Sequence, residues 1–383
     1  MIYLFWISLI GIIYTFIGYP MSLCLFNKIL KKKHVHKNKN YQPNVSFIIA
    51  AHNEEKSIIK KLENTISLHY PKEKLEIIVS SDNSIDTTNK KVKNFIEKHP
   101  EFNIVLYEVK KRMGKTNAQN EAIKITKGEI LTFSDANSIW KEDALMKLIS
   151  NFSDETIEYA CGKLEYINSF ENITSNAENT YWNYDLWLRQ IESEYGSITA
   201  GNGAIYAIRK KNIKFISVIQ CHDGIYPTLT VLAGKRAIYD NTAIAYEKAG
   251  ETLQDEFSRK VRMNRGLLKI KYGYIQKYNP FKTGIFSYFY FCHRYLRYSL
   301  YLFHIMLFIS SIYLCKNMFY YLIMMLQIIF YLFAIIGAIS KSSMKIFYFP
   351  YYYTMTIFAQ LFAIIKSCLG KDKPFWEKAE STR

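Results

Sequence analysis

The sequence of 383 residues has little cysteine and no motif in which cysteines are paired. Its six cysteines include no Cys-x-x-Cys pair and no spacing typical of metal ligands, which argues against a zinc site or a disulfide framework. No internal repeat and no low-complexity segment occurs, so we expect no repeat architecture. Hydrophobic residues make up 49% of the chain, which excludes a disordered tail protein.

Acidic residues are scarce relative to basic ones, and the first segment of the chain has no charged residue at all. The chain has 33 Asp and Glu against 50 Lys and Arg, a formal net charge of +17. Residues 1–27 carry no charge and exceed the length of about 20 residues that crosses a bilayer. They also lack the basic start and small-residue cleavage site of a signal peptide, so we expect an uncleaved transmembrane anchor.

A basic linker, residues 28–42, follows the anchor and contains no acid. The positive-inside rule places such a linker in the cytoplasm. A nucleic-acid-binding patch would also explain the lysines, but their position beside a membrane span favours the topological signal, and no nucleic-acid partner is expected.

The C-terminal part lacks charge in three stretches of about spanning length, 298–315, 317–340 and 346–365. They predict transmembrane helices over 298–370, preceded by an interfacial helix at 284–297 and followed by a basic tail at 371–383. Both flanks of the last stretch are basic, however, so a simple crossing there conflicts with the positive-inside rule. The alternative, a re-entrant or interfacial segment, stays open.

Between these ends, residues 43–283 alternate short β-branched runs with helical stretches, which predicts an α/β domain with a parallel sheet. We expect strands at 45–51, 75–80, 103–109 and 129–133. Ligands gather at the carboxyl ends of strands in open α/β sheets, so Glu54, Asp82 and Asp135 are candidate site residues.

Three motifs in this domain have both a functional and a purely structural explanation. Small residues end the first strand before Asn53 and Glu54, which suits close approach of a ligand or simply a capped helix. Three cations surround Gly114, which suits phosphate binding or a solvated loop. Asp135-Ala136-Asn137 places two oxygen-bearing side chains on one face of a strand, which suits a hard divalent cation or an Asx-turn.

Several strings occur in order between Pro43 and Gly266: FIIAAHNEE, SSDNSIDTT, KRMGKTNAQNEAI, FSDANSIW, GNGAIYAIRK, HDGIYPTLTVLAGKRAIYD and RKVRMNRG. Together they resemble the catalytic domain of family-two glycosyltransferases, in the membrane-embedded branch that includes hyaluronan, cellulose and poly-N-acetylglucosamine synthases. The resemblance implies a Rossmann-like GT-A nucleotide-sugar-binding domain, flanked by transmembrane helices. It also implies a multi-pass protein of the inner (cytoplasmic) membrane with its catalytic domain in the cytoplasm.

The resemblance also implies a role for each matching position. Asp223 would be the general base that takes the proton of the acceptor hydroxyl, which gives inversion at the anomeric carbon. The remaining implied residues are Ala51, Glu54, Asp82, Lys115 and Asp135 for the nucleotide of a UDP-sugar, Asp135 and Asn137 for Mg²⁺ or Mn²⁺, Gly201, Asn202 and Gly203 for the sugar or acceptor, and Arg259 and Arg262 for the diphosphate at the membrane interface.

The sequence departs from the family pattern at three places. His222-Asp223 stands where many relatives have two acids, and the role of His222 is open. The metal motif reads Asp-Ala-Asn and keeps one carboxylate. The QxxRW motif of processive synthases has no Gln or Trp here, since the stretch from Arg259 to Met263 reads RKVRM, so addition of one or a few sugars stays as plausible as polymerisation. In the tail, Trp376 and Arg383 match a pattern common in relatives.

Two tryptophans, Trp182 and Trp187, suit either stacking on sugar rings or packing of a helix, and packing is the more common use.

The sequence therefore predicts an inverting, metal-dependent hexosyl- or N-acetylhexosaminyl-transferase that makes a bacterial exopolysaccharide or surface glycan. Its partners would be a UDP-sugar donor, a glycan or lipid-linked acceptor, membrane lipid and export subunits. One alternative is a transferase acting on a polyprenyl phosphate or lipid-linked oligosaccharide. A second is a non-catalytic subunit of an export complex, which retention of the three aspartates argues against.

Overall fold

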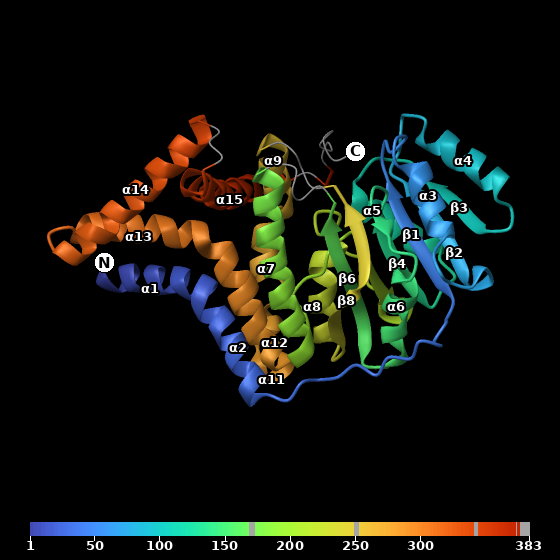
Figure 1. Cartoon of the computed structure of the whole chain (residues 1–383), viewed down its shortest axis with the longest axis horizontal. Helices are drawn as coiled ribbons and strands as arrows, with labels where there is room; N and C mark the ends of the chain where they lie inside the picture. The colour runs from blue at the N-terminus through green and yellow to red at the C-terminus, as the bar shows by residue number, and fades with distance from the viewer. Residues whose placement is uncertain (168–172, 249–252, 341–343, 373, 376–383) are drawn as a thin grey trace.

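The structure is a computed structural model that describes residues 1–167, 173–248, 253–340, 344–372 and 374–375 (Figure 1). A mixed α/β domain is joined to a group of long helices that contains the N-terminus (Figure 1). Trp376 and Arg383, singled out in the sequence, lie outside the described residues.

An eight-stranded sheet organises the α/β domain, with the strand order β3-β2-β1-β4-β7-β6-β8-β5. The first four strands are parallel, as expected, and the second half mixes parallel with antiparallel pairs. The strands are β1 (Val45–Ala51), β2 (Leu75–Ser81), β3 (Asn103–Glu108), β4 (Ile130–Asp135), β5 (Ile139–Trp140), β6 (Ile157–Tyr166), β7 (Tyr206–Arg209) and β8 (Arg236–Glu247).

Crossover helices α3 (Ile58–Ile66), α4 (Thr88–Lys98) and α5 (Lys115–Ile125) follow the first three strands. The chain winds outward from β1 to β2 and β3, then returns to the other side of β1 for β4. The strand order therefore reverses between β1 and β4, and such a switch point leaves a crevice at the carboxyl ends of the two strands.

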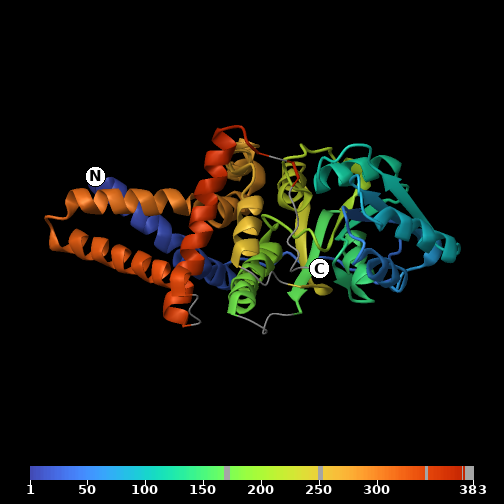
Figure 2. The ribbon, with the colours of Figure 1, turned by 90° about the horizontal axis from the view of Figure 1, so that it is seen from above.

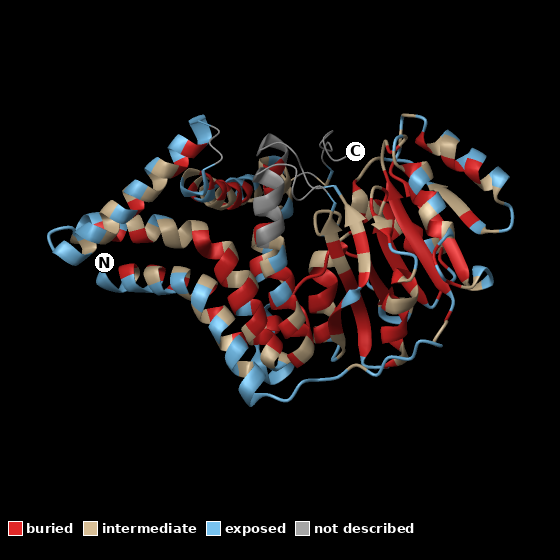
Figure 3. Cartoon of the chain, viewed as in Figure 1, coloured by how far each residue is buried: buried red, intermediate tan, exposed pale blue. Residues whose placement is uncertain are grey.

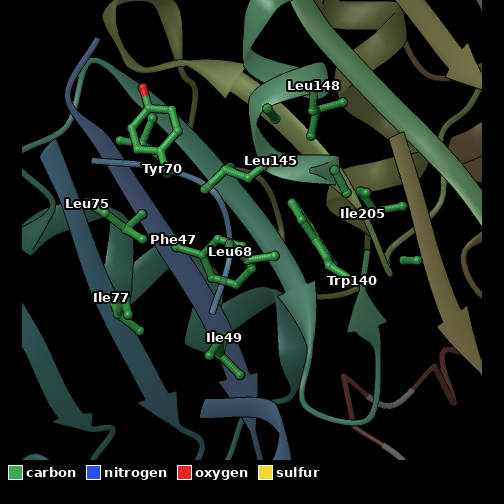
Figure 4. Packing of buried hydrophobic residues seen from close by; sticks show 14 of the residues in the cluster. Phe47, Ile49, Leu68, Tyr70, Leu75, Ile77, Trp140, Leu145, Leu148 and Ile205 are labelled. Atoms are coloured by element: carbon green, nitrogen blue, oxygen red, sulfur yellow. The ribbon is translucent and has the colours of Figure 1, made fainter. Parts of the chain in front are cut away.

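The core has two layers because side chains along β1 alternate between the faces of the sheet. Phe47 and Ile49 pack with Trp140 and with residues of α3 and of α6 (Ala144–Ser150) on one face (Figure 4). Ile48 packs on the other face with Phe133 and with residues of α5 and of α8 (His222–Leu232). Burial on both faces explains the continuous apolar run of this strand.

Three helical segments among the described residues are long and apolar enough to cross a membrane: Ile2–Ile29, Ile285–Leu314 and Met318–Ser340. The first contains α1 (Ile2–Ile13), a π-helical turn at Tyr14–Gly18 and α2 (Tyr19–Ile29). The second runs from α12 (Ile285–Phe289) to α13 (Leu300–Leu314), and the third is α14 (Met318–Ser340). Many of their large apolar side chains are exposed (Figure 3), as expected for lipid-facing helices.

Two details of the expected membrane organisation differ in the structure. The expected interfacial helix at 284–297 is continuous with the helix after it, so Ile285–Leu314 is a single candidate span. The stretch 346–365 belongs to α15 (Lys345–Cys368), which is not among the candidate spans and runs across the direction of α13 and α14 (Figure 2). A lysine at each end of α15 and the tyrosines in its first half suit the bilayer surface, so an interfacial position stays the prediction for this stretch.

The remaining helices connect the two parts. Helix α7 (Ile173–Tyr195) lies between the sheet and the long helices (Figure 1), and α9 (Leu253–Met263) packs against α15. Short helices α10 (Leu267–Tyr272) and α11 (Pro280–Thr283) lead into the second candidate span.

Candidate active site

A cleft of about 500 Å³ lies at the carboxyl ends of β1 and β4, at the switch point of the sheet. Every site residue predicted from the sequence lines it, although the residues come from distant segments. They are Ala51, Glu54, Asp82, Lys115, Asp135, Asn137, Gly201, Asn202, Gly203, Asp223, Arg259 and Arg262. The structure thus brings the whole predicted set together, and the individual roles stay predictions.

At one end of the cleft, β1 and β2 are each followed, two residues after their last residue, by an asparagine with left-handed backbone, Asn53 with φ 50° and Asn83 with φ 54°. Asparagine tolerates this conformation better than most residues, which lets both strands turn sharply. Between them, the Asp82 carboxylate accepts hydrogen bonds from the backbone N–H groups of Gly114 at 2.6 Å and Met113 at 3.1 Å. Asp82 therefore holds the backbone of Met113 and Gly114 against the cleft, a role that the sequence did not indicate.

Lys115 follows this loop at the start of α5 and reaches into the centre of the cleft. Its Nζ lies 2.5 Å from Asp135 Oδ1 and donates to the Gly203 carbonyl at 3.3 Å. Burial lowers the pKa of Lys115, but the carboxylates of Asp135 and Asp223 outweigh burial and raise it above its usual range. A permanently charged ammonium therefore stands beside the strand-end carboxylate.

Asp135 ends β4, and Asn137 lies in the turn that follows. A hydrogen bond of 3.2 Å from Ser138 N–H to the Asp135 carbonyl closes this turn. Glu247, at the end of β8, accepts a hydrogen bond from the Ser138 hydroxyl and lines the same cleft. Burial and the neighbouring Asp135 raise the pKa of Glu247 to about 7. The sequence analysis missed Glu247, whose only signal is an acid that ends a strand.

The donor set of this turn fits a hard divalent cation. Asp135 and Glu247 offer carboxylate oxygens and Asn137 an amide oxygen, which are the ligand types of Mg²⁺ and Mn²⁺. Among the described residues no group of three His, Cys, Asp or Glu side chains forms a ready cage, so bound phosphate oxygens would complete the coordination.

Asp223 lies in the first turn of α8, where the helix dipole favours a carboxylate. Proline at position 227 has no N–H to bond the Asp223 carbonyl, which instead accepts from Gly201 N–H at 2.8 Å. The loop Gly201–Gly203, called the glycine loop below, lies against both carboxylates. A Cβ atom added at Gly203 would lie 2.6 Å from Lys115 Nζ, 3.6 Å from Asp135 Oδ2 and 3.8 Å from Asp223 Oδ1. Glycine at this position therefore lets the ammonium and both carboxylates approach the same point of the cleft.

The side chain of Asn202 is used to hold the glycine loop in place. Its Nδ2 donates to the Gly162 carbonyl at 2.7 Å, and its Oδ1 accepts from the N–H groups of Ala204 and Ile205. All of these bonds go to backbone, so Asn202 shapes the wall of the cleft where the sequence suggested a contact with sugar.

On the membrane side, α9 supplies the two predicted arginines. Arg259 is paired with Glu256 at 2.7 Å, and burial together with Arg259 lowers the pKa of Arg262 to about 10. Trp182, for which the sequence left two uses open, also lines the cleft, and so do Arg112, Arg189, Arg265 and Phe375, to which the sequence assigned no role. Trp182 donates to the Leu164 carbonyl at 2.8 Å, whereas Trp187 is 40% exposed and is not part of the lining.

His222, the residue of unknown role, is buried beneath the cleft and does not line it. Its ring packs against Phe133 and Tyr226, and its Nε2 lies 3.0 Å from Asn120 Oδ1. Burial, aided by Lys115, lowers the pKa of His222 to about 3. His222 is thus a neutral core residue that supports the start of α8, not a second acid.

This burial predicts a pH dependence of stability. The folded pKa of His222 is below the unfolded value, so the unfolded state binds more protons and the stability contribution, complete above about pH 6.5, falls as pH decreases toward 3. Between pH 7.5 and pH 5 we expect His222 to cost about 2 kcal/mol of the free energy of unfolding. Denaturant unfolding of the detergent-solubilised protein should show a smaller acid loss in His222→Gln than in wild type. Equal losses in both proteins would contradict the neutral buried state.

Comparison with known proteins places this site in a class. The fold matches the mannosyltransferase PcManGT from Pyrobaculum calidifontis, solved in complex with GDP-Man and Mn²⁺, with a TM-score of 0.72 over 96% of this chain and 99% of that one at 21% identity. Residues 46–216 match the model of glycosyl transferase family 2.

Two curated relatives extend the comparison. A probable glycosyltransferase, YdaM of Bacillus subtilis (strain 168), is 27% identical over 374 residues, 90% of this chain and 88% of that protein. A poly-β-1,6-N-acetyl-D-glucosamine synthase of Staphylococcus epidermidis is 34% identical over 127 residues, 33% of this chain but only 29% of the synthase.

The structural match shows the GT-A fold of glycosyltransferases, and residues 46–216 are similar to glycosyl transferase family 2. Three candidate membrane helices accompany this domain.

Proposed function

We propose that this protein is a membrane-bound inverting glycosyltransferase that moves a sugar from a UDP-sugar to an acceptor hydroxyl in the synthesis of a bacterial surface glycan. The observation that carries the proposal is the convergence of Asp135 and Asp223 near Gly203 in one cleft. One carboxylate serves the diphosphate side of the donor, and the other is free to serve the acceptor.

In the proposed reaction the acceptor hydroxyl gives its proton to the Asp223 carboxylate and its oxygen bonds to the anomeric carbon. The bond from that carbon to the diphosphate breaks on the opposite face, and UDP leaves, so the configuration inverts. Lys115 remains charged beside the departing diphosphate, and Arg259 and Arg262 stand at the membrane side of the same cleft.

Mg²⁺ or Mn²⁺ would be held by Asp135 and Asn137, with Glu247 beside them. Bound there, the ion would neutralise charge on the diphosphate oxygens. The oxygen donors of the turn support this assignment, because they match the ligands that such ions take.

The acceptor has two candidates. The match to a poly-β-1,6-N-acetyl-D-glucosamine synthase supports a glycan. A lipid-linked acceptor is supported by α15, since the Tyr352 hydroxyl of this surface helix donates to Glu256 at 3.0 Å and so ties α15 to the helix that carries the cleft arginines. Short oligosaccharides and polyprenyl-phosphate-linked sugars, offered as acceptors in parallel, would separate the two.

The donor is tested by nucleotide release. Detergent-purified protein would be incubated with a panel of UDP- and GDP-sugars and Mg²⁺ or Mn²⁺, with Asp223→Asn in parallel. Release from one UDP-sugar that the variant loses supports the proposal and identifies the sugar. Release from a GDP-sugar alone would correct the nucleotide, and no release from any donor with either acceptor class would reject the enzyme.

The proposed location is the cytoplasmic membrane with the catalytic domain inside the cell. The N-terminus then lies outside with the turn between α13 and α14, because Trp6 stacks on Phe319 at 5.7 Å between ring centroids. Cys315 is exposed in that turn and Cys368 is exposed at the end of α15.

This topology predicts which natural cysteine a membrane-impermeant maleimide reaches in intact cells. We expect Cys315 to be labelled and Cys368 to be labelled only after permeabilisation, as measured by mass spectrometry. Cys315→Ser is the control and should lose the label from intact cells. Labelling of Cys368 in intact cells would invert the proposed topology.

A further inference from the structure

We propose that Arg189 is a positioning residue that couples the acceptor side of the cleft to the membrane helix 285–314. The inference rests on the proposed function, since it assigns Arg189 the task of placing Asp223 for transfer. It concerns a buried network in α7 that lies outside the motifs singled out in the sequence.

The first contact of the network reaches the site itself. Arg189 Nη1 donates to the Gly201 carbonyl at 2.8 Å, and Gly201 N–H donates to the Asp223 carbonyl at 2.8 Å. The backbone of Gly201 is therefore held from both sides, by the guanidinium and by the start of α8. Two hydrogen bonds through Gly201 therefore connect Arg189 to the backbone of Asp223, the predicted general base.

The second contact reaches the membrane helix. Asp185, one turn before Arg189, forms an ion pair with it in which Arg189 Nε lies 2.7 Å from Asp185 Oδ2. Asp185 Oδ1 accepts from Arg297 Nη1 at 2.7 Å and lies 3.0 Å from His293 Nε2. Asp185, Arg189, His293 and Arg297 are 5%, 5%, 3% and 8% exposed. Ion pairs buried to this degree are costly to break singly, because each would leave an uncompensated charge in a dry environment.

A third contact adds the N-terminal span. Glu192, one turn further along α7, accepts from the Tyr19 hydroxyl at 2.6 Å and bonds His293 Nδ1 at 2.6 Å. The N–H of Thr199, which leads into the glycine loop, also donates to Glu192 at 3.3 Å. Two membrane segments and the glycine loop thus meet on one face of one helix.

The network also shapes the cleft wall, because the Trp182 ring lies 5.0 Å from the Arg189 guanidinium and both side chains line the cleft. The planar fork of the guanidinium lets Arg189 donate a hydrogen bond to Gly201 and form an ion pair with Asp185 at the same time. A lysine ammonium cannot reproduce this geometry. Arg189 therefore fixes Gly201 and Asp223 relative to an acceptor that arrives at the membrane surface.

The test compares Arg189→Lys, Asp185→Asn and the control Gln190→Ala, a neighbour on the same helix whose side chain donates to Glu194. We expect kcat/KM for the acceptor to fall about 10²-fold in Arg189→Lys, as for a misplaced reacting group, while the Kd for UDP changes less than about twofold. The double variant should lose no more than the worse single variant, because the two residues act through one contact.

A second readout does not depend on activity. Hydrogen exchange of the peptide that contains Gly201 should accelerate in Arg189→Lys and Asp185→Asn but not in Gln190→Ala. If the wild-type protein transfers no sugar, the proposed function is wrong. Hydrogen exchange of the Gly201 peptide then still tests whether Arg189 holds the glycine loop. Unchanged exchange in a folded Arg189→Lys protein, or wild-type kcat/KM, would overturn the inference. Should both variants fail to fold, His293→Gln, which leaves the Arg189–Asp185 pair in place, replaces them with the same criteria.

Discussion

Asp223→Asn is expected to lower kcat about 10³-fold, within the range that a general base contributes, while the Kd for UDP changes less than about twofold. The amide keeps the size of the side chain but cannot take the acceptor proton. Gly201 still bonds the backbone carbonyl of residue 223, so the glycine loop keeps its place. Steady-state transfer and calorimetric UDP titration of the same preparation would measure both quantities.

The matched control is Asp143→Asn, which makes the same chemical change at the start of α6, where Asp143 forms an ion pair with Lys147 and does not line the cleft. We expect this control to transfer sugar at the wild-type rate. A loss of UDP affinity in Asp223→Asn as large as its loss of kcat would contradict the role of a base and place the residue in donor binding.

Asp135→Ala is expected to weaken UDP binding in Mn²⁺ about 10²-fold, because the ion that neutralises the diphosphate loses its main carboxylate. In EDTA the variant should bind UDP at least as well as wild type, since the Lys115 ammonium is released from its 2.5 Å contact with Asp135 and can face the diphosphate. Titrations with and without metal therefore separate loss of the metal site from general damage to the cleft.

The two variants together test the division of roles between the aspartates. Asp135→Ala should abolish the metal dependence of UDP binding, whereas Asp223→Asn should preserve it. Equal loss of binding in both variants would show that the two residues serve the same step. Unaltered metal dependence in Asp135→Ala would show that other side chains hold the ion. Glu247, which is bonded to the turn through Ser138, is then the remaining carboxylate.

The pattern of the sequence was sufficient for the first half of the domain and for those cleft residues that the motifs contain. The strand 45–51 was predicted to the residue, because an apolar run buried on both faces and ended by polar residues has few alternatives. The parallel order of the first four strands follows from their crossover helices. Every residue that the ordered motifs indicated lines the cleft, including Gly201 and Gly203.

The sequence was less informative where a residue's role depends on what it faces. Asp82 and Asn202 carry polar side chains at the predicted site, but the fold directs their bonds to backbone. His222 lies beside the predicted base in the chain, yet the first turn of α8 points it into the core. The direction of a side chain is a tertiary property, which spacing along the chain does not contain.

By itself, then, the sequence determined the class of the catalytic domain, its strand-end acids and the apolar segments that flank it, since these depend on local pattern and composition. Only the tertiary structure decided that α15 lies across the other helices, that Glu247 reaches the turn after β4 from the last strand, and that Arg189 links the glycine loop to the helix 285–314. Each of these depends on contacts between segments far apart in the chain, whose energies are set by packing and charge pairing in the folded molecule.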